Sequence, residues 1–293
     1  MKRIFKTIVI ALTATCVLSG CSLVDFSEDC TYYGDVKIRY DWSGLLKGDT
    51  KPGEMQTVFY TIGNSAATYS HALKGDTIIT GIQEGQYNVL SYNPAEGLTF
   101  SEQAGKTVSL PVYRENSKSY TIQAPLLYAA WSDILVQPFE SSSCKLVPVS
   151  CIQQVMIDFV LIRENLNRDV ISLSGELDGV STYYNLQDMV MGESFACLPY
   201  KSIKQPDNNF KANMRVFGLG ANSTALNTTS NNLDVSVLLS DGTTYTEAID
   251  LTGTFYGFTS PAIHLTIEIK LSALGMNISL TDWYTVDQGE VEI

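Results

Sequence analysis

The cysteines are the residues that most directly predict chemistry, namely disulfide formation. Four of them, Cys30, Cys144, Cys151 and Cys197, lie outside the N-terminal segment. Four cysteines permit disulfides in an oxidising compartment and allow three pairings, between which the sequence does not choose. Seven residues of straight strand span about 23 Å. Cys144 and Cys151 can therefore pair only if the chain folds back, for instance near Pro148. We expect at least one disulfide among the four, with buried free thiols as the alternative.

No other group of residues predicts catalysis or metal binding. No two cysteines have the C-x-x-C spacing of zinc or thioredoxin-like sites. The two histidines, His71 and His264, are far apart, and His264 falls on the polar, solvated side of an alternating strand. There is no H-E-x-x-H or G-x-S-x-G motif and no complete phosphate-binding loop. We therefore expect a protein that is not an enzyme and that uses no cofactor and no metal.

The N-terminal segment has the form of a secretory signal. Its first six residues, MKRIFK, carry three positive charges, and a short apolar run follows. That run is too short for a bilayer, which needs roughly 20 residues. It ends in Leu18-Ser19-Gly20-Cys21, which resembles the bacterial lipobox of an aliphatic residue, two small residues and a cysteine. We expect cleavage before Cys21 and lipidation of its thiol; an ordinary signal peptide with an incidental cysteine is the alternative.

Lipidation of Cys21 predicts attachment to the outer membrane. Each buried CH₂ contributes about 0.8 kcal/mol, so two or three acyl chains hold a protein firmly. Ser22 is not the aspartate that retains lipoproteins in the inner membrane of some bacteria. Asp25, Glu28 and Asp29 resemble an acidic surface-export signal. We expect a lipid-anchored protein exposed on the cell surface, and the alternative for the acidic residues is a solvated tether.

The charge of the chain excludes one class of partner. The formal net charge of the 293 residues is −12 at pH 7. Removing residues 1–20 takes away Lys2, Arg3 and Lys6 and no acidic residue, so the net charge becomes −15. A chain this acidic repels phosphate groups, and we expect no nucleic-acid binding.

Apolar residues recur at every second position through most of the chain. Val36, Ile38 and Tyr40 share one side of DVKIRYDW, and IHLTIEIKL (263–271) alternates in the same way. This period is typical of half-buried strands. SCIQQVMIDFVLI (150–162) is apolar on both sides and predicts a buried central strand. No stretch has the pattern of a long amphipathic helix, so the chain is predicted to be all-β and built of β-sandwiches.

We divide the chain into four parts. Residues 1–20 form the signal peptide, and residues 21–30 form the lipidated tether. The polar stretch QPFESSSC (137–144) marks a boundary between two β-sandwich domains. The N-terminal domain is predicted at 31–138 and the C-terminal domain at 139–293.

The order of several segments resembles a known group of proteins. CTYYGDVKIRYDWSG, GIQEGQYNVLSYN, VISLSGELDGVS and the terminal DWYTVDQGEVEI follow one another as in fimbrillin-like lipoproteins of Bacteroidetes. These are distantly similar to the subunits and membrane anchors of fimbriae. The resemblance covers most of the mature chain. It implies two tandem transthyretin-like, Greek-key β-sandwiches and a structural or adhesive role at the cell surface, and it supplies no catalytic residues.

Three further residues are candidates for contact or modification. Tyr183 and Tyr184 are adjacent, so a strand would expose one of them, and the pair is our candidate ligand contact. The tripeptide Asp-Thr-Ile at 76–78 resembles the O-glycosylation sequence of Bacteroidetes, which makes Thr77 a candidate site; a chance match is the alternative. Trp42 continues the apolar side of its strand, so core packing accounts for it better than sugar stacking.

These observations lead to one hypothesis and one alternative. The hypothesis is a surface-anchored fimbrillin-like lipoprotein that anchors or decorates a fimbrium and accepts a strand from another subunit. Val291 and Ile293 alternate with acidic residues at the end of the chain, so we expect that end to pair within its own domain rather than to polymerise. The alternative is a glycan- or ligand-binding lipoprotein for nutrient capture. Exposed aromatics along one sandwich face would favour the alternative, and an open groove in a sheet would favour the hypothesis.

Overall fold

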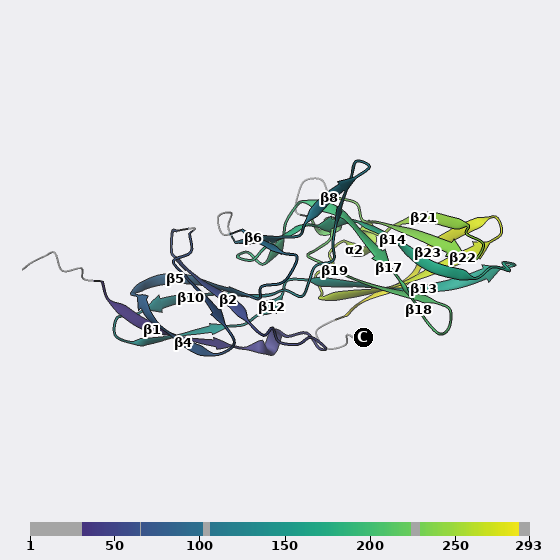
Figure 1. Cartoon of the computed structure of the whole chain (residues 1–293). Coiled ribbons are helices and arrows are strands. Elements are labelled where there is room, and N and C mark those ends of the chain that lie inside the picture. The colour runs from purple at the N-terminus through teal and green to yellow at the C-terminus, as the bar shows by residue number, and fades with distance from the viewer. Residues whose placement is uncertain (1–30, 65, 102–105, 224–228, 287–293) are drawn as a thin grey trace, which may run out of the picture.

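A computed structural model describes residues 31–64, 66–101, 106–223 and 229–286. Nearly all the elements in these ranges are strands, which confirms the predicted all-β class. The helical segments are short: η1 at Trp42–Gly44, η2 at Gly220–Asn222 and α2 at Thr252–Phe255. The predicted signal peptide and tether, with Cys21 and Cys30, lie outside the described residues. Figure 1 shows an elongated molecule with the N-terminal strands at one end and the C-terminal strands at the other.

Two sheets face each other in the N-terminal half. Sheet I has the order β11-β1-β4, with β1 at Tyr33–Tyr40, β4 at Thr77–Gln83 and β11 at Ser141–Leu146. Sheet II has the order β12-β10-β5-β2-β3, with β2 at Met55–Thr61, β3 at Tyr69–Leu73, β5 at Gly85–Tyr92, β10 at Tyr128–Val136 and β12 at Val149–Ser150. The alternating residues Val36 and Ile38 of β1 pack against Phe59 and Val89 between the two sheets.

Sheet III covers the second face of sheet II. It has the order β16-β15-β7-β6, with β6 at Thr99–Ser101, β7 at Thr107–Ser109, β15 at Tyr183–Asn185 and β16 at Val190–Met191. Val58 and Leu90 of sheet II form a second apolar cluster with Val108 and Tyr184 of sheet III. Because β6 and β7 precede β10 in the chain while β15 and β16 follow β14, sheet III joins the two halves of the sequence.

Two larger sheets form the C-terminal half. Sheet IV has the order β18-β19-β13-β22-β23, with β13 at Gln153–Glu164, β18 at Ile203–Lys204, β19 at Phe210–Val216, β22 at Ala262–Ser272 and β23 at Gly275–Val286. Sheet V has the order β21-β20-β14-β17-β9-β8, with β8 at Val112–Glu115, β9 at Lys118–Thr121, β14 at Val170–Ser181, β17 at Phe195–Lys201, β20 at Asn232–Leu239 and β21 at Thr244–Asp250.

The strand predicted to be central and buried, residues 150–162, corresponds to β13. It lies between β19, which is antiparallel, and β22, which is parallel. Val155, Ile157 and Phe159 point into the core between sheets IV and V, and Leu265 of the alternating segment 263–271 joins them. The apolar character of β13 is therefore explained by its place inside the sheet.

The hairpin β8–β9 crosses from one half to the other. It lies between β7 and β10 in the chain, yet Tyr120 of β9 pairs with Cys197 of β17 in sheet V. Lys118 fixes the hairpin to that sheet, because its Nζ lies 2.6 Å from Glu176 Oε2 and 3.6 Å from Asp234 Oδ2. The chain thus leaves the N-terminal sandwich after β5, contributes to sheets III and V, and returns through β10.

The polar stretch predicted as the domain boundary holds a strand. Beyond residue 138, β11 pairs in parallel with β1, and β12 pairs with β10. Cys144 and Leu146 are buried while the serines between 141 and 143 face outward or stay half-exposed, so this stretch alternates although it looks polar. Strand pairing within the N-terminal sheets therefore continues to residue 150.

Candidate functional site

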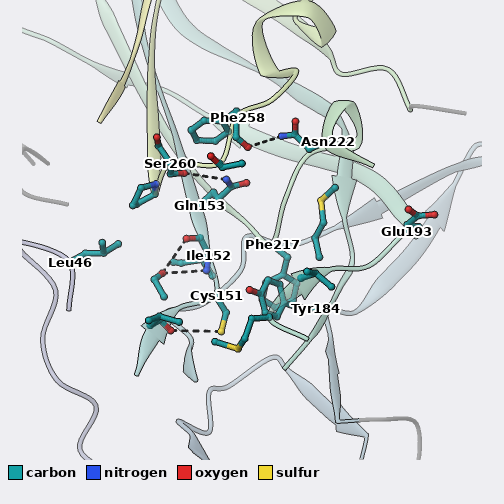
Figure 2. A pocket seen from close by; sticks show the side chains of 17 residues that line it. Leu46, Cys151, Ile152, Gln153, Tyr184, Glu193, Phe217, Asn222, Phe258 and Ser260 are labelled. Carbon is teal, nitrogen blue, oxygen red and sulfur yellow. Dashed lines mark hydrogen bonds between the residues drawn. The ribbon is translucent and has the colours of Figure 1, made fainter. Parts of the chain in front are cut away.

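An open groove of about 750 Å³ lies where the two halves meet. Figure 2 shows side chains from several distant segments converging on it. Most of the lining is apolar. The segments that contribute are the loop after η1, the link from β12 to β13, the region from β15 to residue 193, the stretch from residue 217 through η2, and the loop before β22. The lining residues are Leu46, Val149, Ser150, Cys151, Ile152, Gln153, Tyr184, Met189, Val190, Met191, Glu193, Phe217, Asn222, Phe258, Thr259, Ser260 and Pro261.

The link between β12 and β13 forms one wall of the groove. The Cys151 N–H donates to the Leu127 carbonyl at 2.8 Å, and the Ile152 N–H donates to Ser150 Oγ at 3.3 Å. These bonds turn the chain from sheet II into sheet IV and bury the Cys151 side chain. Burial raises the pKa of the Cys151 thiol, so it stays protonated and behaves as a small apolar group.

The segment from β15 to β16 forms the opposite wall. Tyr184 is buried and lies 5.8 Å, between ring centroids, from Phe217. Tyr183 packs over Gly192, where a Cβ would lie only 2.0 Å from the tyrosine ring, so this position requires glycine. Met191 completes the wall, and methionine side chains adapt readily to different apolar surfaces.

The polar side chains of the groove mainly hold its own loops. Gln153 Nε2 donates to the Ser260 carbonyl at 3.2 Å, and Asn222 Nδ2 donates to the Phe258 carbonyl at 2.9 Å. Glu193 is the one charged residue among those that line the groove. Across the described ranges, no three His, Cys, Asp or Glu side chains are grouped to hold a metal ion. The groove thus offers apolar surface and backbone groups rather than acid–base chemistry.

Two edge strands, β12 and β16, border this groove and direct backbone groups away from their own sheets. Tyr128, opposite Ser150 in the antiparallel pair β10–β12, directs its N–H and C=O to Asn93 on the other side. Opposed residues in such a ladder alternate between bonded and non-bonded pairs. The N–H and C=O of Ser150 therefore point away from β10, toward the open side of β12. The same reasoning applies to Met191, because Gly192 beside it makes the bond to Tyr183.

The structure separates the two predicted contact tyrosines. They lie on β15, and Tyr184 faces the groove while Tyr183 is half-buried against Gly192.

Thr77, the candidate glycosylation site, is the first residue of β4 and is half-buried opposite Ile38. The preceding Asp76 carboxylate accepts the Tyr40 N–H at 2.9 Å, so the fold uses this carboxylate itself. Thr77 does not line the groove.

The expected disulfide is not found among the three described cysteines. Cys144, Cys151 and Cys197 are free and buried in the structure. The prediction of at least one disulfide also includes Cys30, which lies outside the described residues, so it stays a prediction. The locations of the three described cysteines explain why they do not meet: Cys144 belongs to the core between sheets I and II, Cys151 to the cluster of sheets II and III, and Cys197 to sheet V. Near Pro148 the chain passes from sheet I to sheet II, so β11 and β12 lie in different sheets.

His264 is less solvated than the sequence indicated. Its Nε2 lies 3.2 Å from Asp158 Oδ2, its Nδ1 contacts the Tyr284 hydroxyl, and its side chain is 20% exposed. The three residues come from adjacent strands β13, β22 and β23 on the outer face of sheet IV. Sequence reasoning missed this network because the partners are 106 and 20 positions away, and only the strand register brings them together.

Solved structures of low sequence identity resemble the chain over most of its length. A candidate adhesin from Bacteroides ovatus is 19% identical, with a TM-score of 0.60 over 87% of this chain and 95% of the other. The fimbrial anchor protein Mfa2 from Porphyromonas gingivalis is 10% identical, with a TM-score of 0.51 over 81% and 91%. A candidate polysaccharide-binding protein from Bacteroides thetaiotaomicron is also 10% identical, with a TM-score of 0.51 over 88% and 99%.

The chain shares the fold of these proteins. This fold is the one that the resemblance to fimbrillin-like proteins implied. No family model matches the sequence, and no curated protein matches it. In the part of the chain that the structure describes, no helix is both long and apolar enough to cross a membrane.

Proposed function

We propose that this protein is a non-enzymatic, lipid-anchored adhesive protein of the outer membrane that serves as an anchor or accessory subunit of a fimbrium. The fold shared with the fimbrial anchor Mfa2 and with the candidate adhesins supports this role. A lipid on Cys21 attaches the chain to the membrane. The groove between the halves accepts an extended segment of another subunit.

The observation that carries this proposal is the pair of strand edges beside an apolar groove. An extended segment bonds through its backbone to Ser150 or Met191 and directs alternate side chains toward Tyr184 and Phe217. Strand addition of this kind needs both features, because the backbone bonds give the partner its direction and the apolar surface gives affinity. The segment that fits has apolar residues at alternate positions.

Photocrosslinking in intact cells tests the groove. A benzoylphenylalanine at Val190, which lines the groove and is 52% exposed, is expected to crosslink to an extended segment of a fimbrial subunit. The matched control is the same substitution at Ile203, which is 72% exposed and lies on the short edge strand β18 of sheet IV. Crosslinks that form equally from both positions, or only between copies of this chain, would contradict the proposal.

A separate experiment tests the anchor. Cys21→Ala is expected to abolish incorporation of a labelled fatty acid and to release the protein into soluble fractions. A Cys16→Ala variant serves as the control, because Cys16 lies within the apolar run and is removed with the signal. Continued labelling of the Cys21→Ala variant would show that the assignment is wrong, whatever the outcome at the groove.

A further inference from the structure

A second hollow, of about 630 Å³, lies on the outer face of sheet V. It spans four strands, because Ser174 of β14 stands between Lys201 of β17 and Ser236 of β20, and Thr246 of β21 is paired with Ser236. Sheet V is the sheet labelled β21, β14 and β17 in Figure 1. Unlike the groove at the junction, this hollow is lined mostly by polar side chains.

The floor of the hollow is set by Gly175. A Cβ at this position would lie 1.8 Å from the Asp234 carbonyl oxygen, so any side chain would displace β20. The Tyr200 hydroxyl lies beneath and donates to the same carbonyl at 3.1 Å. The depression is therefore fixed by packing and does not depend on the rotamer of a surface side chain.

Hydrogen-bonding groups surround this floor in a fixed arrangement. Ser236 Oγ and Thr246 Oγ1 lie 2.9 Å apart. The carboxylates of Glu176 and Asp234 are both held by Lys118 Nζ. Burial alone would lower the pKa of Lys118, but its hydrogen bond to Glu176 and the charge of Asp234 outweigh burial and raise it. Each carboxylate keeps further lone pairs that a ligand hydroxyl can reach.

Two aromatic rings stand beside these carboxylates. Tyr113 of β8 pairs with Tyr120 of β9, and their rings are nearly parallel, with centroids 5.5 Å apart and planes inclined by 19°. Tyr120 lies two positions after Lys118 on β9, so the two side chains share one face of the hairpin. The rings therefore lie next to the lysine that holds Glu176. Tyr113 is 47% exposed.

We infer that this face binds a neutral carbohydrate. A pyranose ring presents apolar C–H groups on its faces and hydroxyls around its edge. Tyrosine rings suit the first, and carboxylates with serine and threonine hydroxyls suit the second. Lys118 and Lys201 balance the local charges of Glu176 and Asp234, and the chain as a whole carries −12, which disfavours acidic sugars. The site is independent of the junction groove and of the fimbrial role proposed above.

An array of immobilised neutral oligosaccharides built from mannose, galactose, xylose and N-acetylglucosamine tests this site. The full mature protein is expected to bind at least one of them. Tyr113→Ala is expected to weaken that binding by about tenfold, the loss typical of one aromatic contact. Tyr113→Phe keeps the ring and is expected to retain binding.

The matched control is Tyr256→Ala, which removes a tyrosine that is 76% exposed in the turn after α2. This variant is expected to bind like the unmodified protein, and far-UV circular dichroism verifies that all variants are folded. Saturation-transfer NMR with the bound oligosaccharide measures the same loss in solution. Absence of binding to every neutral glycan, binding to acidic glycans alone, or unchanged binding by Tyr113→Ala would overturn the inference.

Discussion

The two halves of the molecule bury their apolar residues in different ways. In the C-terminal half, one continuous cluster fills the space between sheets IV and V and includes Phe159, Leu173, Val235 and Ile267. In the N-terminal half, the apolar residues divide into two smaller clusters, one on each face of sheet II. Phe59 belongs to the first of these, and its neighbours in β2 belong to the second.

Because of this difference, the N-terminal half depends on the C-terminal half more than the C-terminal half depends on it. Sheet II needs a cover on both faces, and the cover on its second face is sheet III, half of which comes from β15 and β16. The C-terminal half also receives strands from the other half, but the hairpin β8–β9 lies at the edge of sheet V and outside the core cluster. The N-terminal half is therefore expected to lose its structure whenever the C-terminal half does.

The largest expected effect comes from Phe159→Ala in the core of the C-terminal half. Phe159 lies on the central strand β13, has no exposed surface and stacks on Tyr200 with centroids 6.1 Å apart. Removing a buried phenylalanine costs about 3–5 kcal/mol of unfolding free energy through lost burial and the cavity left behind. Denaturant unfolding followed by circular dichroism measures the loss. Leu274→Ala, at a residue 98% exposed, serves as the control and is expected to change stability little.

Leu127→Ala tests the second cluster, between sheets II and III. Leu127 is fully buried there, and its loss is expected to cost about 2–4 kcal/mol. Because the N-terminal half depends on this cluster, it should unfold before the C-terminal half or together with it. A C-terminal half that unfolds first, with the N-terminal half still folded, would contradict the unequal dependence. Leu135→Ala, at a residue 52% exposed on β10, the strand that begins directly after Leu127, is the matched control.

Sequence periodicity was enough for the strands whose side chains alternate. The segments around Val36 and Ile263 and the central strand β13 were predicted because burial on one face or on both leaves a local pattern. The sequence predicts a boundary at β11 because the outward residues of this strand are serines, and only Cys144 and Leu146 carry the apolar signal. Propensity alone does not recognise so short an alternation beside Pro138 and Pro148.

The groove could not be predicted from the sequence, for a different reason. Its lining residues range from Leu46 to Pro261, and each of them is an ordinary core or loop residue when read alone. Tyr184 was selected because two adjacent tyrosines on a strand face opposite sides, and that reasoning led to one residue of the groove. Nothing local signals that β12 and β16 direct backbone groups away from their sheets, since this depends on how Tyr128 and Tyr183 pair with these two strands.

The alkylation rates of the buried thiols test the same comparison between the two halves, with a smaller expected effect. Burial raises the pKa of Cys144 to about 11, and burial followed by the contact with Asp178 raises the pKa of Cys197 to about 12. Both are expected to resist alkylation in the folded protein. Cys197 lies where β9 meets sheet V through a single pair, so release of the hairpin should expose it on the order of tenfold faster than Cys144, whose exposure requires opening of a core.

Mass spectrometry after timed alkylation measures these rates for each peptide. Denatured, unreduced protein is the control and should label Cys144, Cys151 and Cys197 equally. Equal rates in the folded protein would mean that the hairpin is as stable as the cores. A disulfide between any two of the three would contradict the structure itself.

The smallest expected effect concerns the ion pair that joins β11 to the end of β1. Asp41 Oδ2 lies 2.7 Å from Lys145 Nζ, and Asp41 Oδ1 accepts the Ser43 N–H at 3.0 Å. The bond to Lys145, followed by those to Ser43, lowers the pKa of Asp41 from 3.8 to about 2. A carboxyl group with a lowered pKa in the folded state stabilises the fold above its ordinary pKa. That contribution is lost as the pH falls from 3.8 through about 2.

NMR titration of the Asp41 carboxyl should show the low pKa, and Lys145→Met should raise this pKa while leaving the Ser43 bond in place. An ordinary pKa for Asp41 in the unmodified protein would mean that β11 is not held against β1 as described, and the N-terminal sheets would then end nearer residue 138.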